Sequence, residues 1–285
     1  MEAKNLLFRT KKTFNLRGRL WTLEQPVVMG IINSTPDSFY ANSRMSSTDA
    51  ALHRAERMLA DGATILDIGG YSTRPGAAEV EEQEEADRVA PVIEAIVKHF
   101  PEAIVSVDTF RASVAETAVR AGAVMVNDVS GGADERMFET VSRLDVPYIL
   151  MHSKGTPQTM TQLTQYTDML SEMLTFFITR LHMIRKSGIK DVILDVGFGF
   201  AKTIEQNYFL LKNLEHFHIL ELPMLVGISR KSMIYKRLNI TPEESLNGTT
   251  VLNTLALSKG AQLLRVHDVK EAVDSVKLYN LMASS

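Results

Sequence analysis

The chain has 285 residues, and its 45% hydrophobic and 23% charged content is ordinary for a globular protein. A formal net charge of −3 gives no electrostatic basis for a nucleic-acid partner or for binding an anionic membrane. The absence of cysteine excludes disulfides, thiolate metal sites and a cysteine nucleophile.

The length fits one large hydrophobic core, so residues 1–285 are expected to form a single domain. No apolar stretch reaches the ~18 residues of a membrane span. The first residues also lack the apolar core of a signal peptide. We therefore expect a cytoplasmic protein with no membrane partner.

The amino-terminal segment, residues 1–26, is expected to precede the main fold as an extension. Residues 7–25 of it predict a short β-hairpin, with turn residues around Lys11-Lys12 and Arg17-Gly18. Val27–Asn33 is then the first buried strand, and polar residues follow it directly.

A glycine signal recurs along the rest of the chain. The segments ADGATILDIG, RAGAVMVND, KSGIKDVILD and SKGAQLLRVH each place a glycine after a helical pattern, with an apolar strand behind it. The helical patterns include Ser47–Asp61 and Tyr166–Ile184, the latter with an apolar stripe that indicates core packing. The acidic segment Glu79–Asp87 is expected to be a solvated helix start. Gly69-Gly70 should end a strand in a turn that only glycine enters cheaply.

Eight apolar strands alternate with these helical patterns. Such alternation implies a parallel sheet, and eight units in one domain imply a closed (β/α)8 TIM barrel. An open doubly wound sheet is the main alternative, but no G-x-G-x-x-G follows any strand. The strands are expected at residues 27–33, 104–108, 147–151 and 223–228, and in the runs that begin at Thr64, Val124, Val192 and Leu263.

Polar or ionisable residues end every predicted strand. They are Asn33, Asp67, Asp108, Asn127-Asp128, His152, Asp195, Ser229-Arg230-Lys231, and Arg265 with His267. In a barrel these ends form one rim, which is where barrel enzymes build their active sites. Burying so many polar groups together costs stability unless a polar ligand satisfies them.

The rim residues divide into two chemical sets. The first offers acceptors and one amide, which suits a flat heterocycle with an amino-pyrimidinone edge; it comprises Asp108, Asn127 and Asp195. The second suits an anion and comprises Asn33, Arg74, Arg265 and His267. Asn33 also offers a hard oxygen that Mg²⁺ accepts alongside phosphate, and Lys231 can bridge the two sets. No Ser-His-Asp order or HExxH motif supports covalent hydrolysis or zinc catalysis.

These motifs closely resemble those of the dihydropteroate synthase family of folate biosynthesis, which sulfonamides inhibit. The matching segments run in family order over nearly the whole chain. They are NSTPDSF (33–39), DIGGYSTRPG (67–76), SVDTFR (106–111), VNDVSGG (126–132), MHSKGTP (151–157), ILDVGFGFAKT (193–203), VGISRKS (226–232) and RVHDV (265–269).

The resemblance implies a transferase reaction. It would condense 6-hydroxymethyl-7,8-dihydropterin pyrophosphate with p-aminobenzoate and release pyrophosphate. It also implies Mg²⁺ as cofactor, two small-molecule substrates and a homodimer.

The same resemblance implies a role for each matching residue. The pterin would be held by Asp108, Asn127, Met151, Asp195 and Lys231. The p-aminobenzoate cleft would be shaped by Phe39, Thr73, Arg74, Pro75, Phe200 and Ser229. Pyrophosphate would be bound by Asn33, Arg74, Arg265 and His267, with Asn33 also binding Mg²⁺. The catalytic residues would be Lys231, Arg265, His267 and Asp37, with Asp37 and Arg74 ordering the two mobile loops.

The chain departs from the family pattern at four places. Tyr71 stands where the family often has glutamate, and Tyr40–Ser43 replaces a glycine-rich SDGG. Val196 replaces the proline of Asp-Pro-Gly, and Ala201 replaces the glycine before a lysine. None of these positions is assigned to the chemistry.

Three other functions fit part of the pattern. A pterin-barrel methyltransferase would share the Asp-Asn-Asp set but has no use for the pyrophosphate residues or the lysine of SRKS. A non-catalytic pterin-binding protein is disfavoured by the intact Asn33, Lys231, Arg265 and His267. A Schiff-base aldolase would use Lys202 or Lys231 and would form an adduct that borohydride traps.

Overall fold

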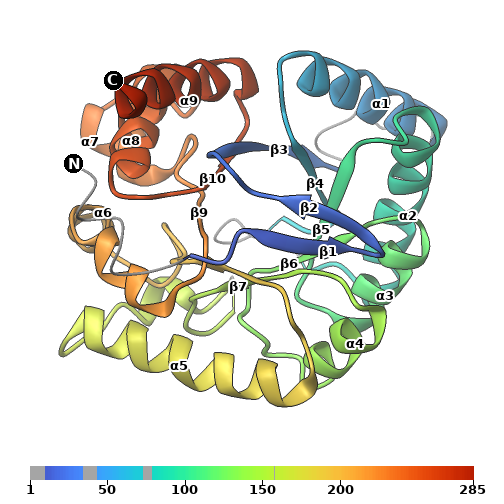
Figure 1. Cartoon of the computed structure of the whole chain (residues 1–285), viewed down its shortest axis with the longest axis horizontal. Helices are drawn as coiled ribbons and strands as arrows, with labels where there is room; N and C mark the ends of the chain where they lie inside the picture. The colour runs from blue at the N-terminus through green and yellow to red at the C-terminus, as the bar shows by residue number, and fades with distance from the viewer. Residues whose placement is uncertain (1–9, 35–43, 73–78, 157) are drawn as a thin grey trace.

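Eight parallel strands form a closed barrel with helices around it (Figure 1). The structure is a computed structural model that describes residues 10–34, 44–72, 79–156 and 158–285. The strand order around the barrel is β10-β3-β4-β5-β6-β7-β8-β9. The barrel strands are β3 (Val27–Asn33), β4 (Ile65–Gly69), β5 (Ile104–Asp108), β6 (Met125–Asp128), β7 (Tyr148–Met151), β8 (Val192–Asp195), β9 (Met224–Val226) and β10 (Leu263–Val266). The predicted (β/α)8 TIM barrel with an amino-terminal hairpin is confirmed.

The helices follow the strands in alternation. They are α1 (Arg44–Ala60), α2 (Glu82–His99), α3 (Ala112–Arg120), α4 (Met137–Leu144), α5 (Met169–Ser187), α6 (Ile204–Lys212), α7 (Ser232–Leu238), α8 (Leu246–Ser258) and α9 (Val269–Ser284). Short 3-10 helices are η3 (Met160–Gln162), η4 (Leu214–Leu220) and η5 (Glu243–Ser245). Among the described residues, none of the helices is both long and apolar enough to cross a bilayer.

The predicted glycine signals end helices as expected. Gly62, Gly122, Gly188 and Gly260 all have positive φ, between 88° and 118°. A residue with a Cβ rarely adopts this conformation, so glycine allows the chain to turn from each helix into the next strand.

Helix α5 starts later than predicted, at Met169 instead of Tyr166. Asp168 is the reason, because its carboxylate accepts a hydrogen bond from the Ser171 N–H and caps the helix. Tyr166 lies before this cap, and its hydroxyl donates to the Ala201 carbonyl over 3.1 Å.

The hairpin consists of β1 (Thr13–Leu16) and β2 (Arg19–Thr22), which pair antiparallel. Arg17 and Gly18 form its turn, both with positive φ. The turn predicted at Lys11-Lys12 is wrong. The Lys12 carbonyl accepts from the Leu23 N–H over 2.7 Å, so this segment extends the hairpin pairing instead of turning.

The hairpin lies across the barrel (Figure 1) and closes its amino-terminal end. Phe14, Leu16 and Leu23 pack in one cluster with one buried residue from each barrel strand. Fully burying a side chain such as Phe14 stabilises the fold by about 1.5–3 kcal/mol. The strand residues of this inner apolar layer are Met29, Ile65, Ile104, Met125, Ile149, Ile193, Leu225 and Leu263.

Two local predictions need correction around helix α2. Gly70 does not have a positive φ; instead a Cβ at this position would lie 2.8 Å from a Val89 methyl and 2.9 Å from the Glu85 carbonyl oxygen. Glycine is therefore needed for close approach of the strand end to the helix. The acidic helix start is exposed at Glu81 and Glu84, but Glu85 is fully buried, so the prediction of a solvated segment is wrong for Glu85.

Candidate functional site

Above the inner apolar layer, most side chains that face the barrel interior are polar. Side chains alternate along a strand, so residues two positions further on also face the barrel interior. At this level lie Asp67, Ser106, Asn127, Asp195 and Arg265. One step higher, at the strand ends, lie Asn33, Asp108, Ser229 and His267. The predicted polar rim is therefore a stack of two polar levels on a closed apolar floor.

Arg265 forms the centre of this stack. Its Nε donates to Asp67 Oδ2 over 2.6 Å, and its Nη2 donates to Asp108 Oδ2. Burial lowers the pKa of Arg265, but the charges of Asp67 and Asp108 outweigh burial and hold that pKa above its usual value. Burial raises the pKa of Asp108, with Arg265 opposing the shift.

Asn127 has its amide oriented by Asp67. The Asn127 Nδ2 donates to Asp67 Oδ2 over 2.8 Å, which leaves Oδ1 as a free acceptor. Among the described residues, the buried Asn127 Oδ1, Asp67 Oδ1 and Asp108 Oδ1 have no hydrogen-bond partner. Buried acceptors without donors are costly, so this group is built to receive N–H donors from a ligand.

Asp195 and Lys231 lie on the next part of the rim. Asp195 accepts the Gly197 N–H over 2.7 Å, and burial raises its pKa while Lys231 opposes that shift. The Lys231 Nζ donates to the Phe198 carbonyl and lies 4.7 Å from the centre of the Phe200 ring. Burial lowers the Lys231 pKa to about 8.

Ser229 and His267 are in direct contact, with Ser229 Oγ 3.0 Å from His267 Nδ1. The backbone N–H of His267 also donates to Ser229 Oγ over 3.2 Å. Burial, followed by the charge of Arg265, lowers the His267 pKa to about 4, so this imidazole is neutral at physiological pH. Arg230 and Asp268 make a bidentate ion pair at 2.7 and 2.9 Å that ties the same two strand ends together.

Asn33 lies beside Asp108 at the mouth. A Cβ at Gly69 would be 3.8 Å from Asn33 Oδ1 and 3.7 Å from Asp108 Oδ2, so both side chains flank Gly69 at the strand ends. No group of three or more His, Cys, Asp or Glu side chains in the described ranges could hold a metal ion. The neutral oxygen of Asn33 fits a Mg²⁺ ion that takes most of its ligands from a bound phosphate.

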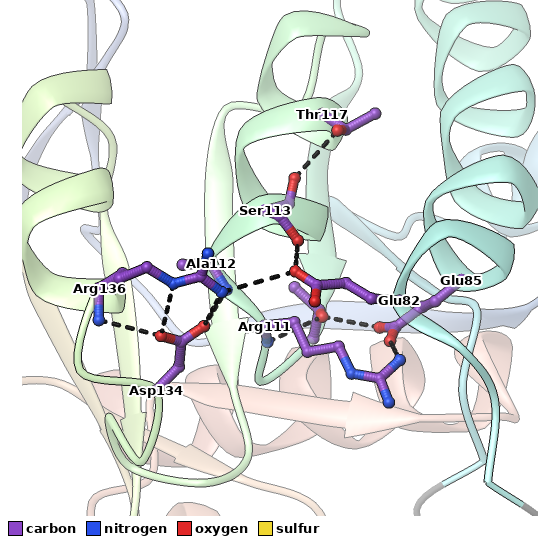
Figure 2. Close-up of polar contacts among 9 residues, drawn as sticks. Glu82, Glu85, Arg111, Ala112, Ser113, Thr117, Asp134 and Arg136 are labelled. Carbon is purple, nitrogen blue, oxygen red and sulfur yellow. Dashed lines mark hydrogen bonds and ion pairs between the residues drawn. The ribbon is translucent and has the colours of Figure 1, made fainter.

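A polar network supports Asp108 from behind. Buried Glu85 accepts hydrogen bonds from Thr109 Oγ1 at 2.7 Å and Arg111 Nη1 at 2.8 Å. Figure 2 shows how Glu85 and Glu82 reach from the start of α2 toward the residues that follow Asp108. This contact fixes the chain directly after Asp108.

The structure brings together most residues assigned by the sequence. Met151, 1% exposed, lies opposite Asp195 in the strand register and so belongs to the same part of the rim. Five assigned residues fall outside the described residues: Asp37, Phe39, Thr73, Arg74 and Pro75. Asp67 received no role from the sequence, although a carboxylate that interrupts an apolar strand was a usable signal.

Free acceptors above a closed apolar floor, with cations beside them, are typical of a barrel enzyme with a polar ligand site at the carboxyl ends of its strands. Known proteins place the chain within that class. The family described as pterin binding enzyme matches residues 29–267. The dihydropteroate synthase of Escherichia coli (strain K12) is 41% identical over 271 residues, which cover 94% of this chain and 96% of that protein.

Solved structures agree with this match. The Yersinia pestis dihydropteroate synthase in a sulfonamide drug complex has a TM-score of 0.90 and 42% identity, covering 96% of this chain and 100% of the other. The Xanthomonas albilineans enzyme in complex with 7,8-dihydropteroate has a TM-score of 0.86 and 36% identity, covering 96% and 99%. The chain belongs to the pterin-binding enzymes and, within them, to the dihydropteroate synthases of folate synthesis, which are transferases.

Proposed function

We propose that this chain condenses 6-hydroxymethyl-7,8-dihydropterin pyrophosphate with p-aminobenzoate to give 7,8-dihydropteroate and pyrophosphate. The observation that carries the proposal is the set of free buried acceptors on Asp67, Asp108 and Asn127. A dihydropterin presents ring and amino N–H groups, which are the donors that these oxygens lack. Asp195 and Met151 would complete this pterin subsite.

The leaving pyrophosphate would lie toward the mouth, against Arg265 and His267. Arg265 uses two of its donors on carboxylates and keeps others for an anion. When Ser229 donates to His267 Nδ1, the ring proton sits on Nε2, and the neutral imidazole offers an N–H to the leaving group. Asn33 would hold Mg²⁺, which supplies charge neutralisation for the pyrophosphate.

The reaction needs no nucleophilic side chain. As the bond between the pterin methylene and the pyrophosphate oxygen breaks, positive charge spreads into the dihydropterin ring. The amine of p-aminobenzoate then attacks the methylene and loses a proton. The protein binds the departing anion, fixes the ring and limits access of water, since the hairpin closes the opposite end of the barrel. Phe200 and Ser229 would border the arylamine subsite.

We also propose a homodimer that pairs through the carboxyl-terminal helices. Large apolar side chains are exposed on the neighbouring helices α8 and α9, which pack against each other (Figure 1). They are Val251, Leu255, Leu278, Leu281 and Met282. An exposed apolar patch of this kind indicates a protein interface. Light scattering tests the assembly, and the mass of a single chain across the accessible concentration range contradicts it.

The function is tested by measuring pyrophosphate release with both substrates, with each one omitted, and with Mg²⁺ removed by chelation. We expect release only when the pterin pyrophosphate, p-aminobenzoate and Mg²⁺ are all present. Asn33→Ala should raise the Mg²⁺ concentration needed for half-maximal rate, because the metal loses one protein oxygen. Release that does not depend on p-aminobenzoate contradicts the proposed reaction, and tight Mg²⁺ binding without pterin pyrophosphate contradicts the proposed metal site.

A further inference from the structure

Lys202 is a buried lysine that has no place in the site assigned so far. It is 8% exposed, and its Nζ has three partners. The Nζ lies 3.1 Å from His152 Nδ1 and donates to the carbonyls of Gly197 and Phe200 over 2.9 and 3.0 Å. A buried ammonium with three acceptors is fully satisfied, so it acts on the protein and not directly on a ligand.

The segment that Lys202 contacts has an unusual backbone. Gly197, Gly199 and Ala201 have positive φ of 69°, 80° and 49°. A Cβ at Gly197 would lie 2.0 Å from the His152 carbonyl oxygen, so only glycine allows this approach. Ala201 carries a Cβ in the left-handed region, which costs about 1–2 kcal/mol. Such a conformation persists only when surrounding contacts hold it.

Two lysines hold this segment at three of its carbonyls. Lys202 binds the carbonyls of Gly197 and Phe200, and Lys231 binds the carbonyl of Phe198 between them. Lys202 therefore fixes the backbone carbonyl of Phe200, while the Phe200 ring contacts the Lys231 ammonium. Loss of Lys202 would free the Phe200 carbonyl and leave Lys231 as the remaining lysine contact.

The charge of Lys202 is set by groups on several elements. Asp195 on β8 favours the protonated form, whereas Lys231 at the start of α7 and Lys154 in the segment after β7 oppose it. Burial, the largest effect, lowers the Lys202 pKa to about 7. Burial also lowers the His152 pKa to about 2, so His152 is neutral and can accept from Lys202.

We propose that Lys202 is a positioning residue for the p-aminobenzoate subsite, which acts by holding the Gly197–Phe200 segment and the Phe200 ring in place. The proposal rests on the proposed function, since it assigns Phe200 to the arylamine side. It predicts that loss of Lys202 raises the KM of one substrate more than that of the other. The arylamine KM depends on Lys202, while the pterin acceptors on β4, β5 and β6 do not contact this segment. Asp195 meets the segment at the Gly197 N–H, whereas Lys202 binds the Gly197 carbonyl.

The test compares Lys202→Met with wild type, because methionine keeps an unbranched apolar stem and removes the charge and its donors. We expect the p-aminobenzoate KM to rise about tenfold, since small displacements of positioning groups cost large factors. The KM for the pterin pyrophosphate should change much less. Lys190→Met is the control, because Lys190 precedes β8 and pairs with Asp145 at the surface instead.

A second readout uses the protonation of Lys202. As pH rises through 7, Lys202 loses a proton and one donor, so the wild-type arylamine KM should rise. In Lys202→Met this dependence should vanish, and a dependence from Lys231 near its pKa of about 8 should remain. If Lys202→Met does not fold, the wild-type profile still tests the proposal, and a flat arylamine KM between about pH 6 and 9 overturns it.

Different experimental results would overturn this proposal and the proposed function. A wild-type protein that makes no dihydropteroate from both substrates overturns the function. An active wild type whose arylamine KM matches that of Lys202→Met overturns only the role of Lys202. Equal rises in both substrate KM values also overturn it, because they indicate a general structural effect.

Discussion

Two polar clusters, each with a fully buried carboxylate, lie close together in this barrel and differ in one respect. The rim cluster, formed by Asp67, Asp108, Asn127 and Arg265, has three oxygens without partners among the described residues. The helix-start network, formed around Glu85, Arg111, Asp134 and Arg136 (Figure 2), has both oxygens of Glu85 and of Asp134 hydrogen-bonded.

Burial of the central carboxylate does not distinguish the two clusters. Asp67 and Glu85 are both 0% exposed, and both pair with an arginine. The difference is the number of partners that the fold supplies. Where the fold leaves acceptors free, a ligand completes the hydrogen bonding; where it satisfies them, the cluster only supports the structure. Substitutions in the rim cluster should therefore cost binding, and those in the helix-start network should cost stability.

Arg265→Met should have the largest effect and should lower both stability and activity. Arg265 balances the charge of two buried carboxylates and is also proposed to bind the leaving group. The substitution leaves Asp67 and Asp108 buried without their counter-charge, which costs about 3–5 kcal/mol of unfolding free energy. It also removes the proposed contact to the leaving group, so kcat should fall together with stability. Denaturant unfolding and steady-state kinetics on the same sample check both effects. An unfolding free energy equal to that of wild type would contradict the central place of Arg265.

Asp195→Asn should sharpen the distinction by affecting binding alone. The amide presents a donor to ligand N–H groups, and each donor left unpaired costs about 1–3 kcal/mol, so dihydropterin affinity should fall about 100-fold. Calorimetry with a pterin ligand measures the change.

A matched control lies at the other end of the same strand. Asp191 precedes β8 and accepts from the Asn15 N–H over 2.7 Å and from Lys11. Asp191→Asn should lower stability and leave pterin affinity unchanged. If Asp191→Asn lowers pterin affinity and Asp195→Asn does not, the ligand site lies at the other end of the barrel.

Glu85→Gln should have the smallest effect of the three, and it should appear in stability. The substitution weakens the contact to Arg111 and costs about 1–3 kcal/mol of unfolding free energy. Dihydropterin affinity should change little. Glu84→Gln is the control, because Glu84 makes only an exposed pair with Arg88, and such pairs contribute about 0.2–1 kcal/mol. A large loss of pterin affinity with unchanged stability in Glu85→Gln would remove the distinction between the clusters.

The barrel could be predicted because its signals are local. Glycine after a helix and an apolar run after the glycine are neighbours in the sequence, as at Gly62 and Gly188. The start of α5 was misplaced because one aspartate, Asp168, decides it. The family motifs indicate which residues lie at the rim, but not which of them form hydrogen bonds or ion pairs with one another.

The partners within the site could not be predicted, because they come from distant segments. Asp67 meets Asn127 from 60 residues away and Arg265 from 198 residues away. No local pattern indicates that one carboxylate orients an amide and an arginine at once. The same holds for Lys202, whose partner His152 lies 50 residues earlier. The buried state of Glu85 was missed because it lies in an acidic segment whose Glu84 and Asp87 are exposed.

The closed floor of the barrel has a consequence for how the chain folds. The hairpin is the earliest described part of the chain, yet its apolar side packs on a layer that needs Met29 from β3 and Leu263 from β10. That layer is complete only when the last strand pairs with β3. Contacts between such distant segments form slowly, because the intervening chain must first lose its freedom. The hairpin, although early in the chain, should therefore pack against the barrel late in folding. Closure of the barrel should limit the folding rate.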